Sequence, residues 1–238
     1  MPGRVLLITK LKGGSGATTT CRELAAAALG AGVPSGVALV DLDSQGGLTR
    51  WWSRRTRKAP ESGRADMDLL EISADVMPAA AAKLRARYGL VIVDSPPSVH
   101  ETVRAVAAAA DLALVPSRPT VDDLDAVGPI VRLLRGVCDV GFVLTQVPGG
   151  ARSRDGAEAL MRLASLAPVL GRTSFRLDYP RPAATGRTGY EEGGAPRAEI
   201  GELWATLAER LDMAGDDRST SSRDDASTAA GVSGGEGR

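Results

Sequence analysis

The sequence predicts an α/β fold, a doubly wound and mostly parallel sheet with helices on both of its faces. The first observation behind this prediction is a set of short apolar runs without polar alternation, such as Val5–Ile8, Val37–Val40 and Leu90–Val93. Such runs are typical of strands that are buried on both faces. The second observation is that each of these three runs ends in a glycine-rich or acidic motif. In parallel α/β sheets, ligands bind at the carboxyl ends of the strands, so the motifs lie where a site is expected.

The remaining elements alternate between strand and helix along the chain. Strands are expected at 4–9, 37–40, 68–72, 90–93, 111–116, 140–145 and 169–170, and helices at 18–31, 76–87, 100–110, 121–134, 153–166 and 199–213. A chain of 238 residues with 43% apolar content is enough for one core, which we place in a single domain of residues 1–213. Residues 214–238 contain almost no large apolar side chain, so we expect a disordered polar tail.

Composition excludes several classes of function. Lysine plus arginine equals aspartate plus glutamate at 29 each, so any DNA contact must come from a local patch. Cys21 and Cys138 are too few for a disulfide framework or a metal cluster, and His100 alone cannot build a zinc site or a triad. The chain has no stretch of about 18 uninterrupted apolar residues, so we expect a soluble, cytoplasmic protein without a membrane partner.

A glycine-rich stretch, Lys12 to Thr20, lies between the first strand and the first helix. Its glycines let backbone N–H groups point inward, and the helix that follows adds the positive end of its dipole. Such a cup binds phosphate, and Thr18 and Thr19 offer hydroxyls for Mg²⁺ and for a further phosphate contact. The expected nucleotide-binding residues are Lys12, Gly13, Gly14, Ser15, Gly16, Ala17, Thr18 and Thr19. The plain P-loop pattern fails at Leu11, which replaces the first glycine, and at Ala17, which replaces the phosphate-binding lysine.

Acidic residues follow two further strands. Asp41 and Asp43 are one residue apart, so in an extended chain they point to opposite faces and at most one aims at the phosphates directly. Asp94 ends the run Leu90–Val93 and is followed by Ser95 and two prolines, which keep the next loop open. A buried strand that delivers a single carboxylate is what a Mg²⁺·nucleotide site needs. Thr18 and Asp94 are therefore the expected metal ligands.

Taken together, these motifs resemble those of the deviant Walker A ATPases of the ParA/MinD family. Lys12 to Thr20 resembles K-G-G-x-G-K-[ST]-[TS], Asp41 to Gln45 resembles D-x-D-P-Q with Ser44 in place of proline, and Asp94 to Pro97 resembles D-x-P-P. The resemblance implies ATP and Mg²⁺ as cofactors. It also implies catalytic roles for Lys12, which would reach the phosphates of a partner subunit, and for Asp41 and Asp43, which would position water. Ala17 departs from the family's lysine, so any ATP hydrolysis is expected to be very slow.

Within the family, the chain looks closest to small plasmid or chromosome partition ParA proteins, because it starts almost directly at the first strand. This resemblance implies an ATP-dependent homodimer that binds DNA non-specifically on the nucleoid and responds to a centromere-binding ParB-like partner. The alternative is a non-hydrolysing positioning protein for pilus assembly or a secretion machinery, which Ala17 favours and the retained carboxylates oppose. A metabolic ligase of related fold lacks a recognisable substrate motif. An iron-sulfur reductase lacks suitably placed cysteines.

Two arginine-rich segments leave further questions open. Residues 48–58 combine two tryptophans with five cations, and we favour a helix with tryptophans packed inward and arginines solvated over a nucleic-acid surface. The last third is a second candidate for DNA contact, through Arg152, Arg154, Arg162, Arg172, Arg176, Arg181, Arg187 and Arg197. Residues 179–194 are expected to form a loop over the base or a dimer interface. The apolar stripe from Ile200 to Leu211 predicts a core helix, since its other side is acidic and unsuited to a membrane.

Overall fold

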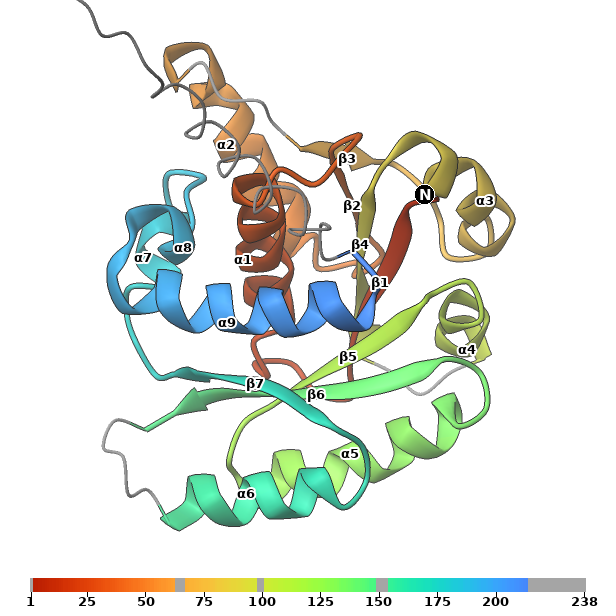
Figure 1. Ribbon diagram of the computed structural model, residues 1–238, viewed down its shortest axis with the longest axis vertical. Helices are drawn as coiled ribbons and strands as arrows, with labels where there is room; N and C mark the ends of the chain where they lie inside the picture. Colours follow the sequence, from red (N-terminus) through yellow and green to blue (C-terminus); the bar gives the residue numbers. More distant parts are fainter. Residues whose placement is uncertain (1, 63–66, 98–100, 149–153, 214–238) are drawn as a thin grey trace, which may run out of the picture.

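The computed structural model describes residues 2–62, 67–97, 101–148 and 154–213. Its sheet contains seven strands, all of them parallel, in the order β3-β2-β4-β1-β5-β6-β7 (Figure 1). The strands are β1 (Arg4–Lys10), β2 (Val37–Asp41), β3 (Asp68–Leu70), β4 (Leu90–Pro97), β5 (Leu112–Ser117), β6 (Asp139–Val147) and β7 (Val169–Ser174). The chain winds outward from the central β1 to β3 and then returns through β4 and β5 to β7. The predicted fold class is therefore confirmed.

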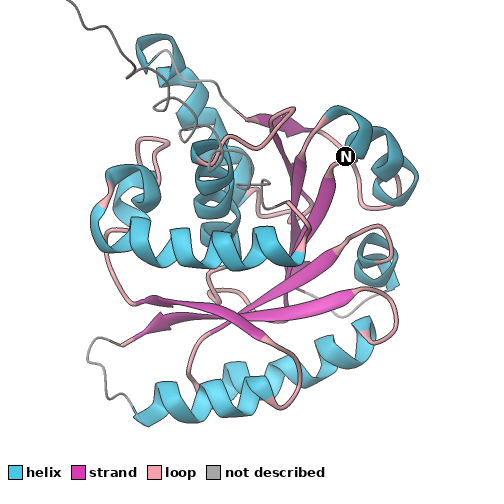
Figure 2. Ribbon diagram, in the orientation of Figure 1, coloured by secondary structure: helices cyan, strands magenta, loops and turns pink. Residues whose placement is uncertain are grey.

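Helices cover both faces of this sheet, as Figure 2 shows. They are α1 (Ala17–Gly30), α2 (Gly47–Ser62), α3 (Met77–Arg87), α4 (Glu101–Ala107), α5 (Val121–Leu134), α6 (Arg154–Ala164), α7 (Pro180–Ala183), α8 (Gly189–Glu192) and α9 (Gly194–Arg210). One core cluster joins one face of the sheet to α1, α2 and α9, with α7 and α8 beside them. A second cluster joins the other face to α3, α4, α5 and α6. None of the helices formed by the described residues has the length and apolar character needed to cross a membrane.

Strand β1 shows why its sequence lacks polar alternation. Leu6 and Ile8 belong to one core cluster and Val5 and Leu7 to the other, and all four side chains are fully buried. Since successive side chains of a strand point to opposite faces, a strand covered by helices on both sides needs apolar residues throughout. This burial fixes β1, and with it the glycine-rich loop that follows, at the centre of the sheet.

Some expected boundaries were wrong. Helix α2 continues to Ser62, beyond the expected end at Lys58, and α9 begins at Gly194 rather than Glu199. Residues 179–194 are not an open loop, because they contain the short helices α7 and α8. Helix α8 begins with a capping box, in which the fully buried Thr188 and the side chain of Glu191 satisfy each other's backbone N–H groups. The tail 214–238, His100 and Arg152 lie outside the described residues, so the expectations for them stay predictions.

The tryptophan-rich segment forms a helix with its large ring inside. Trp51 is fully buried, and its Nε1 donates a hydrogen bond to the carbonyl of Arg187. The expectation that the arginines are solvated was wrong for Arg55, which is buried beside Trp51 and pairs with Glu191 at 2.9 and 3.1 Å. Helix α2 is therefore held against α7 and α8 by these contacts and by the hydrogen bond from Arg54 to the carbonyl of Ala183. The apolar stripe of α9 is buried, as predicted.

Candidate functional site

The glycine-rich loop connects the central strand β1 to α1. Gly14 and Gly16 have φ angles of 83° and 91°, which L-residues with a side chain rarely adopt, so glycine is required at both positions. Gly16 is also the N-cap of α1, and it has no side chain with which to satisfy the first N–H groups of the helix. An added Cβ at Gly13 would meet nothing within 4 Å. The loop is thus an open cup whose free donors suit an anion.

Two residues from β6 hold this loop in shape. Thr145 Oγ1 donates a hydrogen bond to the carbonyl of Ser15 at 2.7 Å, and Gln146 Nε2 donates one to the carbonyl of Gly14 at 2.9 Å. Both bonds engage carbonyls of the loop and leave its N–H groups free. The cup is therefore preorganised before any ligand arrives. These two residues were missed by the sequence analysis, because their contact with the loop spans about 130 residues of chain.

The two predicted metal ligands lie together. Thr18 Oγ1, in the first turn of α1, donates a hydrogen bond of 2.6 Å to Asp94 Oδ2 in β4. Asp94 is fully buried, and burial raises the pKa of its carboxyl although Lys10 and Thr18 oppose the shift. The described residues contain no group of three or more His, Cys, Asp or Glu side chains suited to a metal. One hydroxyl and one carboxylate nevertheless fit Mg²⁺, which usually takes few protein ligands and completes its shell with substrate phosphates and water.

A lysine that the sequence analysis missed also contacts Asp94. Lys10, the last residue of β1, places its Nζ 2.7 Å from Asp94 Oδ1 and 3.0 Å from Asp43 Oδ2. Burial opposes its charge, but Asp94 and Asp43 hold the pKa of Lys10 above its ordinary value. Burial likewise opposes the charge of Asp43, whose pKa is held low by the N–H of Gln45 and by Lys10. A lysine at a strand end resembles an ordinary solvent-facing terminus, which is why the pattern did not reveal it.

The two carboxylates at the end of β2 diverge, as their spacing predicted. Asp43 turns toward Lys10, whereas Asp41 accepts hydrogen bonds of 2.9 Å from both the N–H and the Oγ1 of Thr49. Asp41 also accepts a bond of 3.2 Å from the backbone N–H of Asp43. Thr49 lies in the first turn of α2, so Asp41 fastens that helix to β2. The structure thus brings Thr18, Asp94 and Asp43 together around Lys10, while Asp41 is occupied at the start of α2.

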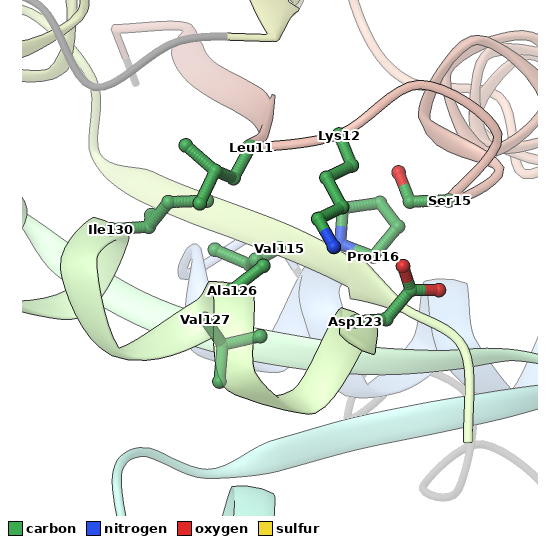
Figure 3. A pocket seen from close by; sticks show the side chains of 9 residues that line it. All are labelled: Leu11, Lys12, Ser15, Val115, Pro116, Asp123, Ala126, Val127 and Ile130. Atoms are coloured by element: carbon green, nitrogen blue, oxygen red, sulfur yellow. The ribbon is translucent and has the colours of Figure 1, made fainter. Parts of the chain in front are cut away.

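Lys12 points away from the glycine cup. Its Nζ donates a hydrogen bond of 3.3 Å to the carbonyl of Asp122 at the start of α5, and Figure 3 shows its side chain extended toward Asp123. The small cavity in this view, about 10 Å³, separates the loop from α5. Ser15 lines it, and its buried Oγ has no hydrogen-bond partner in the described part of the chain. The outward direction of Lys12 agrees with a role beyond its own phosphate cup.

A larger cavity of about 210 Å³ opens beside the loop. It is lined by Gly16, Thr19, Thr20, Glu23, Thr145, Gln146, Thr173, Ser174, Phe175, Arg176, Tyr179, Pro180 and Ile200. Thr19 thus links this cavity to the loop, and two aromatic rings supply apolar wall. Concave sites with apolar walls and a few polar groups are typical of small-ligand sites. The start of the segment 179–194, expected over a base or at a dimer interface, forms part of this wall.

Two acids at this cavity were also missed, Glu23, which is fully buried, and Glu199, which is half-buried. Glu23 of α1 accepts hydrogen bonds from the backbone N–H groups of Gly189 at 2.9 Å and Tyr190 at 2.8 Å. Burial raises the pKa of Glu23 to about 7, although these N–H groups oppose the shift. Glu199 accepts bonds from Tyr179 Oη at 2.6 Å and Ser174 Oγ at 2.7 Å. Glu199 thus holds Ser174 and Tyr179, which line the cavity, while Glu23 connects the cavity wall to the start of α8.

Several arginines of the last third are paired with acids. Arg162 pairs with Asp125, Arg176 Nη2 lies 3.3 Å from Glu199, and Arg187 Nη1 lies 2.9 Å from Glu192. Arg172 and Arg181 are exposed. Pairing lowers the positive potential that a phosphate backbone would meet, so the region is less basic than its arginine count indicates.

The fold and this site agree with a family comparison. The model of the CobQ/CobB/MinD/ParA nucleotide binding domain matches residues 6–188. The chain belongs to this family of ParA/MinD-type nucleotide-binding ATPases, as the motifs predicted.

Individual relatives show the same fold with varied named roles. Apo McdA from Cyanothece is 17% identical, with a TM-score of 0.72, and the match covers 87% of this chain and 99% of the McdA chain. A putative plasmid partition protein from Borrelia burgdorferi bound to AMPPNP is 14% identical, covers 89% and 100%, and has a TM-score of 0.69. The cell division ATPase MinD from Pyrococcus furiosus is 17% identical, covers 87% and 99%, and has a TM-score of 0.70.

A curated sequence is more similar over a shorter span. Maintenance of carboxysome distribution protein A from Gloeobacter kilaueensis is 36% identical over 124 residues, which is 51% of this chain and 52% of that protein. The match thus spans about half the length of this relative.

Proposed function

We propose that this protein binds Mg²⁺·ATP at the glycine-rich loop and acts as a ParA-type partition protein. In this proposal, nucleotide binding drives a homodimer that attaches to DNA non-specifically and segregates a plasmid or chromosome with a ParB-like partner. The observation that carries the nucleotide site is the 2.6 Å contact between Thr18 and Asp94 beside a preorganised glycine cup. A hydroxyl in the first turn of a helix, paired with a carboxylate from a neighbouring strand, forms the arrangement that Mg²⁺ and phosphate need together.

Each part of the site has a role in this proposal. The N–H groups of the loop and of the first turn of α1 receive the phosphates, and Thr18 and Asp94 hold Mg²⁺. The 210 Å³ cavity receives the nucleoside, with Phe175 and Tyr179 available as apolar surface for the base. Bound Mg²⁺ would neutralise phosphate charge and orient the terminal phosphate.

Hydrolysis would rest on Asp43 as the residue that orients a water molecule. Asp41 is less suited, because one of its carboxylate oxygens accepts from the N–H of Asp43 and the other from Thr49 in the first turn of α2. Ala17 supplies no cation to the phosphates, and loss of one preorganised donor costs about 10²–10³ in rate. We therefore expect slow hydrolysis of ATP and a long-lived complex between the protein and its nucleotide.

A second candidate is a positioning protein for a protein assembly, such as a pilus or secretion machinery, that does not hydrolyse ATP. Ala17 favours it, and so does the pairing of Arg162, Arg176 and Arg187 with acids, which weakens the case for a DNA-binding face. The relative named for carboxysome distribution is likewise a positioning protein by name, although the match covers only half of it.

Two measurements on the full chain test these proposals. Calorimetric titration with AMPPNP and Mg²⁺ should detect binding, and no heat at millimolar ligand would contradict the nucleotide site. Retention on duplex DNA in the presence of ATP should fall steeply from low to moderate salt, because phosphate contacts release counterions. Absent or salt-independent retention would favour the positioning candidate over partition.

A further inference from the structure

A buried cation lies beside the proposed magnesium ligands, on a residue outside the nucleotide motifs. Lys10 Nζ contacts Asp94 at 2.7 Å and Asp43 at 3.0 Å, and its side chain is only 6% exposed. In the part of the chain that the structure describes, no second ion pair reaches either carboxylate. The ammonium of Lys10 is therefore a buried charge at the junction of β1, β4 and the segment after β2.

The glycine-rich loop itself lacks such a charge. P-loops carry a lysine that reaches the β- and γ-phosphates, and Ala17 stands at that position here. Ala17, the first residue of α1, is 3% exposed and belongs to the core cluster on that face of the sheet. Lys12, the cation of the loop, is turned toward Asp122. The loop thus offers the phosphates N–H and hydroxyl groups but no ammonium from its own residues.

We propose that Lys10 replaces the missing lysine and contacts a terminal phosphate oxygen of the bound nucleotide, an inference that rests on the proposed nucleotide function. Asp94 connects Lys10 to the proposed magnesium ligand Thr18, since one of its oxygens contacts Lys10 and the other accepts the hydrogen bond from Thr18. The ammonium therefore lies one carboxylate away from the hydroxyl expected to hold Mg²⁺. The flexible four-carbon stem of lysine lets the ammonium exchange Asp43 for a phosphate oxygen.

The choice of residue type supports the same inference. The chain has 29 cationic residues and only four lysines, Lys10, Lys12, Lys58 and Lys83, so arginine is its ordinary cation. Two of the four lysines flank the start of the glycine-rich loop. Lysine is a compact point charge, whereas the guanidinium of arginine is a broad planar fork. A lysine retained at a buried site in an arginine-rich chain indicates a need for the smaller group.

The first test removes the charge and keeps the stem. We expect Lys10→Met to weaken binding of AMPPNP in the presence of Mg²⁺ by about ten- to a hundredfold, the usual value of one charge-assisted contact. Lys83→Met, which removes an exposed lysine of α3, should bind like the parent. Circular dichroism and urea unfolding establish that each variant is folded. A folded Lys10→Met protein with parental affinity would overturn the inference and leave the proposed nucleotide site standing.

A second pair of variants separates phosphate contact from simple neutralisation of acids. In the Lys10→Met background, Ala17→Lys should restore most of the lost affinity, because it returns a cation to the phosphate cup. Asp43→Asn in the same background should restore little. If Asp43→Asn recovers parental affinity, Lys10 serves only to balance a carboxylate and the inference is wrong. If the variant with lysine at 17 does not fold, the Asp43→Asn comparison decides alone. A parent that binds no AMPPNP would overturn the proposed function and this inference together.

Discussion

At the scale of single residues, Glu23 shows how a buried acid can make stability depend on pH. Its side chain is enclosed between α1 and α8, where burial raises its pKa to about 7 from an ordinary 4.5. Between these two values, the folded state binds more protons than the unfolded state. The free energy of unfolding therefore falls as pH rises from about 4.5 through about 7. The full loss in the free energy of unfolding that this shift implies is on the order of 3 kcal/mol.

We predict that Glu23→Gln flattens this part of the stability profile. A glutamine keeps the shape and accepts one of the two N–H bonds, but it has no charge to bury as pH rises. Urea unfolding at pH 5, 6, 7 and 8 measures the slope. Glu209→Gln, at an exposed position of α9, is the control and should keep the parental slope. Equal slopes for Glu23→Gln and the parent would show that Glu23 stays ionised across this range.

At the scale of elements, α9 packs against the same face of the sheet as α1 and contributes Ile200 to the 210 Å³ cavity. Leu203 is fully buried, and it packs so close to Gly171 of β7 that a Cβ at Gly171 would lie 2.9 Å from Leu203 Cδ1. Two residues in the first two turns of α9 also serve the cavity, since Ile200 lines it and Glu199 holds Ser174 and Tyr179. The shape of the cavity therefore depends on the packing of α9 against β7.

We expect Leu203→Ala to lower the free energy of unfolding by about 2–5 kcal/mol, because it leaves a cavity between α9 and β7. The neighbouring Glu202→Ala removes an exposed side chain of the same helix and should change stability by less than about 0.5 kcal/mol. Denaturant unfolding of both variants provides the comparison. A cost below about 1 kcal/mol for Leu203→Ala would mean that α9 packs loosely.

At the scale of the whole molecule, the fold was predictable, but the long-range contacts of the site were not. Apolar runs such as Val5–Ile8 identify buried strands, because the apolar character of each residue indicates that the residue itself is buried. The motifs at the strand ends identify the loop. Lys10, Thr145 and Gln146 act through residues that are far away in sequence, so local patterns carry no sign of them. The scarcity of lysine in the chain was the one available signal for Lys10. The end of α2 was missed because Pro60 resembles a helix stop.

The assembly of two molecules is a prediction at this same scale. Lys12 is exposed and directed away from its own cup, so a second copy can receive it at a bound nucleotide. We predict that ATP raises the mass measured by light scattering from monomer to dimer and that Lys12→Ala prevents this change. A Lys12→Ala protein that dimerises with ATP as well as the parent would exclude this role for Lys12.

In the proposed function, Thr18 and Asp94 form a magnesium site for a bound nucleotide. The most direct measurement is the calorimetric affinity for AMPPNP with and without Mg²⁺, in the parent and in Thr18→Val. Valine keeps the shape of threonine and removes the hydroxyl that lies 2.6 Å from Asp94. We predict that Mg²⁺ strengthens binding to the parent by at least about tenfold and that this gain is largely lost in Thr18→Val. Equal gains from Mg²⁺ in the two proteins, or no binding to the parent at all, would show that Thr18 and Asp94 do not form this site.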